Sequence, residues 1–143
     1  MEYADYYQDA LSEPMKWFPL DTDFMNDPKV LKLSAMGGWQ AVGRYVALIA
    51  CLARADGRRY DLSEPMGWRF LSAAMVCGGE VMDTEELHEF ITTLYDLRLI
   101  DREMWDESRK VSMPRLCREA ENMARKTAAN MVRTAKATAA RLK

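Results

Sequence analysis

The sequence predicts a mainly α-helical (α+β) fold, a winged helix-turn-helix with a helical N-terminal preamble and a long C-terminal helix. Three observations predict it. Apolar residues recur at helical spacing in several segments, two short stretches near residue 100 alternate as strands do, and the chain closes with a long stretch rich in Ala, Lys and Arg. The chain has 143 residues, 49% of them hydrophobic, which suits a single core.

This pattern divides the chain into an acidic aromatic leader over 1–16, a winged-helix domain over 17–113 and a basic amphipathic helix over 114–143. In the leader, Tyr3, Tyr6 and Tyr7 have helical spacing. The spacing fits a helix docked through its aromatic rings. A loosely ordered segment is the alternative, because chain ends are often mobile.

Capping signals separate the predicted helices. Asp27 precedes Pro28, a combination typical of a helix start, and Gly37 and Gly38 predict the end of that helix. Its buried face is expected to include Met36, and Trp39 is expected to open the apolar stripe of the next helix. The predicted helices span about 27–36, 39–54, 64–76 and 84–97.

The expected strands are short. Residues 58–62 predict one strand, and residues 97–101 and 110–113 predict two more around a polar, turn-like segment at 102–108. Helix, turn, helix and two-stranded ribbon in this order are typical of a winged helix-turn-helix. The ribbon is expected to form the wing, with Trp105 near its tip.

Charge is unevenly distributed. From Arg115 onward the chain has eight basic and two acidic residues, a net charge of +6, which leaves −8 for the rest because the whole chain carries −2. An acidic body with a basic tail predicts two surfaces with different partners.

The C-terminal helix concentrates its basic residues on one side. At about 100° per residue all of them except Arg141 fall within an arc of roughly 100°, opposite a stripe of Leu, Met and Ala. Such an arc can follow a phosphate backbone without reading its sequence. An ordinary solvated face is the alternative; membrane-surface binding is disfavoured by the alanine-rich apolar side. The candidate nucleic-acid contacts, with three from the wing, are Arg102, Arg109, Lys110, Arg115, Arg118, Arg125, Lys126, Arg133 and Lys136.

The second helix of the helix-turn-helix is a poor candidate for reading DNA. Glu85, Glu86 and Glu89 lie on its expected outer face, where a duplex would repel them. His88 among these carboxylates is expected to be solvated. The three glutamates are instead candidate contacts for a protein partner. Trp105 is a further candidate, which can stack on a base or partner or pack on its own ribbon.

No catalytic or cofactor motif is present. The sequence lacks phosphate-binding loops, nucleophile elbows and metalloprotease motifs, so we expect no enzyme, no cofactor and no metal. Cys51, Cys77 and Cys117 are far apart and are expected to be small buried apolar residues of a cytoplasmic protein. No apolar run reaches the roughly 20 residues of a membrane span.

Residues 17–24, Trp-Phe-Pro-Leu-Asp-Thr-Asp-Phe, followed by Asp27-Pro28-Lys29-Val30, resemble the N-terminal domain of phage replication-organiser proteins. The likeness continues through Tyr45 to residues 94–101 and covers about residues 17–120. The domain of this family is similar in style to the winged helix of the DnaD-type primosomal protein. The resemblance implies a DNA-replication role in a mobile element, through contacts with DNA and replication proteins.

Two functions are therefore expected to compete. The first is a non-enzymatic DNA-binding module that contacts phosphates nonspecifically through the final helix and the wing. The second is a protein–protein adaptor or oligomerisation domain that acts through the acidic winged-helix body. A measurement of DNA binding at different salt concentrations distinguishes these two functions, because phosphate contacts weaken as salt rises.

Overall fold

The computed structural model describes residues 1–76 and 79–142. Cys77 and Gly78 therefore lie outside the described residues. Within the described residues the elements are α1 Tyr3–Ser12, η1 Phe24–Asn26, α2 Pro28–Arg54, η2 Asp56–Arg58, β1 Arg59–Asp61, α3 Pro65–Ala74, α4 Thr84–Asp96, α5 Arg102–Ser108, β2 Lys110–Ser112 and α6 Pro114–Arg141.

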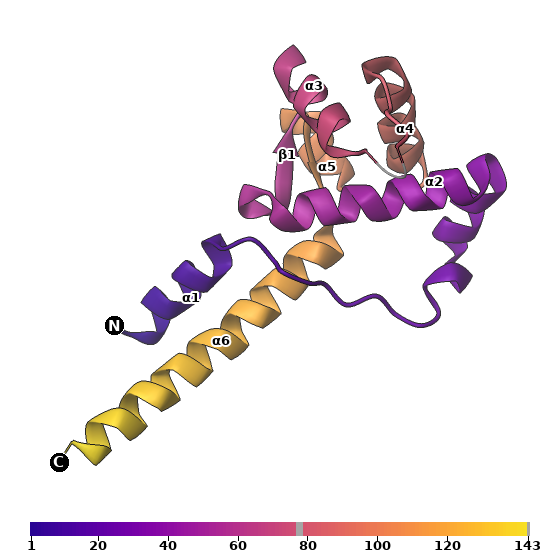
Figure 1. Cartoon of the computed structure of the whole chain (residues 1–143). Helices are drawn as coiled ribbons and strands as arrows, with labels where there is room; N and C mark the ends of the chain where they lie inside the picture. The colour runs from indigo at the N-terminus through magenta and orange to yellow at the C-terminus, as the bar shows by residue number, and fades with distance from the viewer. Residues whose placement is uncertain (77–78, 143) are drawn as a thin grey trace.

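The mainly helical fold predicted from sequence is confirmed. The long helix α2 crosses the middle of the molecule, with α3, α4, α5 and the strands on one side (Figure 1). Helices α1 and α6 lie on the other side, and α6 projects away from the body. Because α2 is covered from both sides, its C-terminal half contributes much of the core, including the fully buried Leu48 and Leu52.

Helix α2 joins the two helices predicted over 27–36 and 39–54. Asp27 caps its start, since its carboxylate accepts a hydrogen bond from the Lys29 N–H at 2.8 Å. Gly38 interrupts it with φ 65° and ψ −156°, a conformation that favours glycine. This break leaves Met36 and Trp39 exposed, so the prediction that they are buried was wrong.

Helices α3 and α4 form the helix-turn-helix beside α2. Four of the five side chains predicted to form the inner face of the helix over 84–97 are buried, namely Leu87, Phe90, Ile91 and Leu94, and the fifth, Leu97, is half-buried. His88 is exposed, as expected, but its ring also stacks on Trp68 of α3, with centroids 3.4 Å apart. The stack adds a contact between the two helices that the sequence did not indicate.

The predicted wing was wrong in its pairing. Strand β2 pairs antiparallel with β1, not with residues 97–101, and Tyr60 faces Val111 in the register. Residues 97–101 instead end α4: Arg98 takes a left-handed conformation with φ 59°, and the Leu99 N–H donates to the Leu94 carbonyl at 2.8 Å. This turn places Ile100 in the core, which explains the apolar alternation that resembled a strand.

Residues 102–108 form the helix α5, where a polar turn was expected. Asp101 is its N-cap and accepts a hydrogen bond from the Met104 N–H at 3.1 Å. The helix ends at Arg109, which is left-handed with φ 55°. A short helix therefore occupies the position of the wing.

Helix α1 packs along the first half of α6 (Figure 1). The buried side chains of α6 recur every four residues: Leu116, which belongs to the core of the body, and then Ala120, Ala124 and Ala128. Small side chains allow the two helices to approach closely. Of the two alternatives for the leader, a docked helix is the one found.

Arg58 fastens the leader to the body. Its side chain is 3% exposed and donates hydrogen bonds to the carbonyls of Ala53, Leu11 and Glu13. The last two belong to the end of α1 and the residue after it. A buried charge is tolerated only when it is hydrogen-bonded in this way.

We expect Arg58→Ala to lower the free energy of unfolding by about 3 kcal/mol, because one buried and two partly buried carbonyls lose a charged donor. Urea denaturation measures this loss. Arg59→Ala, at the exposed neighbouring position, is the matched control and should change stability by less than about 0.5 kcal/mol. Equal stability of the two variants would contradict the fastening role.

Candidate nucleic-acid interface

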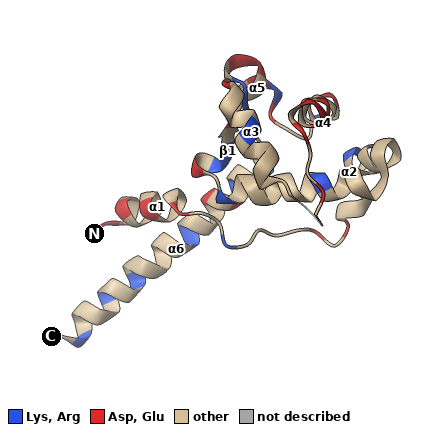
Figure 2. Ribbon diagram, turned by 45° about the horizontal axis from the view of Figure 1, so that its top comes forward, with Lys and Arg blue, Asp and Glu red and all other residues tan. Residues whose placement is uncertain are grey.

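The basic residues of α6 lie on the side of the helix that faces away from α1. All six predicted contacts on this helix are exposed: Arg115, Arg118, Arg125, Lys126, Arg133 and Lys136. The buried alanine stripe lies on the opposite side of the helix. We call these six residues the basic face. Figure 2 shows basic residues spaced along α6, whereas acidic residues gather on α1 and α4.

Few acidic groups neutralise the basic face. Arg115 pairs with Asp21, and Arg125 lies 3.7 Å from Glu121 on the preceding turn. Within residues 1–76 and 79–142, no ion pair involves the other four members. Both pairs are more than 40% exposed, so water screens them and a phosphate can exchange with the carboxylate.

The structure does not bring the wing residues together with the basic face. Arg102 and Arg109 belong to α5 and its end, on the opposite side of α2 from the free end of α6 (Figure 1). Arg102 donates to the carbonyls of Tyr95 at 2.8 Å and Asp96 at 2.9 Å, so it caps the last turn of α4. Its guanidinium also lies 4.8 Å from the Tyr95 ring centroid.

Other side chains around α5 are also engaged within the molecule. The guanidinium of Arg109 lies 5.1 Å from the centroid of the Trp105 ring, and that ring meets Trp68 edge-on at 6.0 Å. Trp105 is half-buried and packs on the core. Lys110 is half-buried in β2. The Asp106 carboxylate accepts a hydrogen bond from the Tyr95 hydroxyl at 2.9 Å, which raises the pKa of Tyr95.

The acidic residues of α4 lie where they were expected. Glu85 and Glu89 are exposed, and Glu86 is half-buried because it pairs with Arg44 of α2 at 3.2 Å. The outer face of α4 therefore carries negative charge that repels a phosphate backbone. Of the three predicted partner contacts on this helix, Glu85 and Glu89 are the more accessible.

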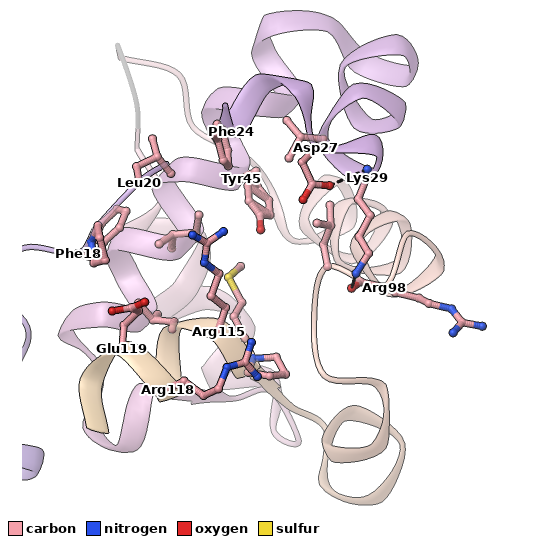
Figure 3. Close-up of a pocket in the computed structure, with 17 residues that line it drawn as sticks. Phe18, Leu20, Phe24, Asp27, Lys29, Tyr45, Arg98, Arg115, Arg118 and Glu119 are labelled. Atoms are coloured by element: carbon pink, nitrogen blue, oxygen red, sulfur yellow. Dashed lines mark hydrogen bonds between the residues drawn. The ribbon is translucent and has the colours of Figure 1, made fainter. Parts of the chain in front are cut away.

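A pocket of about 240 Å³ lies where the segment before η1 crosses the starts of α2 and α6 (Figure 3). Its apolar lining includes Phe18, Leu20, Phe24, Val30, Tyr45, Ile49, Leu99 and Leu116. Its charged lining consists of Lys29, Arg98, Arg115 and Arg118 against Asp27 and Glu119. The pocket is thus more basic than acidic, although the body around it is acidic overall.

Two ionisable groups in the pocket have shifted pKa values. Burial and then the nearby Asp27 carboxylate raise the pKa of Tyr45, and Arg115 partly opposes this. The hydrogen bond to Asp21 raises the pKa of Arg115. Tyr45 therefore remains a neutral phenol and Arg115 a cation at physiological pH.

Sequence reasoning identified Arg115 and Arg118 but missed the rest of the pocket. Lys29 and Arg98 meet there because the Lys29 amino group donates to the Arg98 carbonyl at 3.2 Å, a contact between residues 69 positions apart. Nothing in the sequence pairs these segments. The extended segment with Phe18 and Leu20 was the only local signal, and it entered the prediction through the family resemblance alone.

The capping role of Arg102 leads to a stability prediction. Arg102→Ala should lower the free energy of unfolding by about 2 kcal/mol, because two helix-end carbonyls lose a charged donor. Thermal or urea unfolding measures the change, and Glu103→Ala at the exposed adjacent position is the control. If Arg102 were a free phosphate ligand without a structural role, its variant would be as stable as the original chain.

Within the described residues, no helix combines the length and apolar character that crossing a membrane requires. Among known proteins, neither the curated sequences nor the solved structures include a match to the chain.

One family of domains does match. The family described as Lin1244/Lin1753-like, N-terminal, matches residues 17–112, which is more than half of the chain and includes α2 to β2. The match begins at Trp17, the residue before Phe18, which is the first residue of the pocket lining. This chain therefore belongs to the Lin1244/Lin1753-like N-terminal domain family.

Proposed function

We propose that this protein is a non-enzymatic DNA-binding module of a phage or mobile-element replication protein, and that it contacts phosphates through the basic face of α6. The observation that carries the proposal is the segregation of charge on α6. Six basic side chains are exposed on one side, while the opposite side packs on α1. The replication role is supported by the resemblance of residues 17–120 to phage replication-organiser domains.

The dimensions of α6 suit a phosphate backbone. The helix has 28 residues and is about 42 Å long at 1.5 Å per residue. Duplex DNA carries one negative charge per about 1.7 Å of its axis, so several phosphates lie within reach of one helix face. Lysine and arginine side chains on such a face bind phosphates without reading bases, which gives strong but nonspecific binding.

The proposal predicts the effect of removing charge from the basic face. A variant with Arg125, Lys126, Arg133 and Lys136 replaced by Gln should bind duplex DNA at least about tenfold more weakly at low salt. The slope of log affinity against log salt should fall by about 0.9 for each phosphate that the variant no longer neutralises. Fluorescence anisotropy at several salt concentrations measures both quantities.

The matched control removes the same charge elsewhere. Lys16, Lys32, Arg59 and Arg69 are exposed and lie outside α6, so replacing these four by Gln changes net charge equally. This control should retain most of the binding. If the two variants lose affinity equally, overall charge explains binding and the basic face does not. Circular dichroism checks that both variants remain helical.

A protein–protein adaptor is the second candidate, and one observation favours it. The outer face of α4 exposes Glu85 and Glu89, and the neighbouring α3 exposes Met66 and Phe70. Exposed apolar side chains bordered by polar ones are a common feature of surfaces that bind a protein partner or a second copy of the chain.

Light scattering with the intact chain and with a Phe70→Ser, Glu89→Gln variant tests the adaptor. The adaptor predicts an assembly of the intact chain that the variant weakens, because the variant removes both an apolar and a charged contact. A monomer at high concentration whose DNA binding depends on the basic face would favour the first function instead.

A further inference from the structure

The pocket beside the start of α6 has the size of a single flat ring. A cavity of about 150 Å³ is enough to hold benzene, so the 240 Å³ here has room for one heterocyclic base. Three aromatic side chains line it, namely Phe18, Phe24 and Tyr45 (Figure 3). Aromatic rings are the usual partners of unpaired bases.

The pocket also contains the polar end of Tyr45. Tyr45 is 9% exposed as a whole residue, and its hydroxyl is not one of the buried polar atoms that lack a partner among the described residues. Figure 3 shows this hydroxyl directed into the pocket, near the Arg115 side chain. This hydroxyl is placed to donate to, or accept from, the edge of a ring bound there.

The pocket is continuous with the basic face. Arg115 and Arg118 line it and also begin the basic arc of α6. Both side chains are exposed, so they can hold phosphates at the mouth while the aromatic lining holds a base. Asp27 and Glu119 add carboxylate oxygens to the lining, which can accept hydrogen bonds from an exocyclic amino group.

We propose that this pocket binds one unpaired base of a single-stranded nucleic acid, while Arg115 and Arg118 hold the adjacent phosphates and the strand continues along α6. This inference rests on the proposed function and specifies it further, since it predicts a preference for single strands. A base within a duplex reaches such a pocket only by leaving its stack, which costs a few kcal/mol. An acidic peptide carrying an aromatic residue is the competing occupant.

The first test keeps the phosphates and removes the bases. The probes are a fluorescent oligothymidylate, an abasic strand of the same length and a matched duplex, each titrated with the intact chain. One stacked base should make the oligothymidylate bind about 5- to 100-fold more tightly than the abasic strand. Phosphate contacts alone predict equal affinities for these two strands.

The second test changes the pocket and leaves the charge unchanged. Phe18→Ala should reduce the preference for bases by about fivefold or more, because it removes an aromatic wall. Tyr45→Phe retains the ring and removes only the hydroxyl, and it should reduce the preference by a few-fold. Trp17→Ala is the control, since Trp17 is 66% exposed and does not line the pocket.

The outcomes separate the two proposals. Base-dependent binding that both pocket variants weaken and the control retains supports the inference. Binding that depends on the basic face but is equal for abasic and base-containing strands overturns the pocket and leaves the proposed function intact. Absence of binding to every nucleic acid overturns both.

A competition experiment tests the alternative occupant of the pocket, an acidic peptide that carries an aromatic residue. An acidic peptide with one phenylalanine is added to the complex with oligothymidylate. Binding of this peptide that Phe18→Ala abolishes, together with equal affinity for abasic and base-containing strands, assigns the pocket to a peptide and overturns the inference. Failure of the peptide to displace the oligothymidylate supports it.

Discussion

The packing of α1 on the alanine stripe of α6 is the contact on which the candidate interface depends. Ten residues of helix are marginally stable alone in water, so α1 requires this contact, and Arg58 fixes its end to the body. The packed side of α6 is apolar and small, which leaves only the opposite side for its arginines and lysines. The direction in which the basic side chains point therefore follows from which face α1 covers, and the acidic residues of α1 do not reach them in any ion pair of the described residues.

The same arrangement creates the pocket. The chain leaves α1, runs beneath α2 and crosses the start of α6 before it enters η1 (Figure 1). Asp21 on this segment lies at the crossing and forms an exposed ion pair with Arg115. The aromatic residues of the segment then lie beside the first basic residues of α6. Basic side chains of α6 and aromatic side chains of this segment therefore line the same pocket, although they come from opposite ends of the sequence. A change that releases the segment should therefore alter both the pocket and the start of the basic face.

The sequence predicted those features that depend on periodicity along one helix. The buried face of α4 and the opposition of basic and apolar sides on α6 follow from helical spacing and needed no tertiary information. Residues 97–101 were predicted as a strand because a helix-ending turn that buries Leu and Ile shows the same apolar alternation as a strand. The left-handed conformation of Arg98 could not be predicted from its residue type. The exposure of Trp39 depends on the break at Gly38 and was missed for a similar reason. The pocket could not be predicted, since Asp21 and Arg115 are 94 positions apart and only the fold brings them together.

The most direct measurement of the central claim is an NMR titration of the isotope-labelled intact chain with a short single-stranded oligonucleotide. Orientation of the basic face by α1 predicts that amide signals shift along the exposed side of α6 and around Phe18 and Tyr45, and that α4 and α5 remain unchanged. Shifts confined to α3, α4 and α5 would contradict the account, because the nucleic acid would then bind the helix-turn-helix and the basic face would be an ordinary solvated surface.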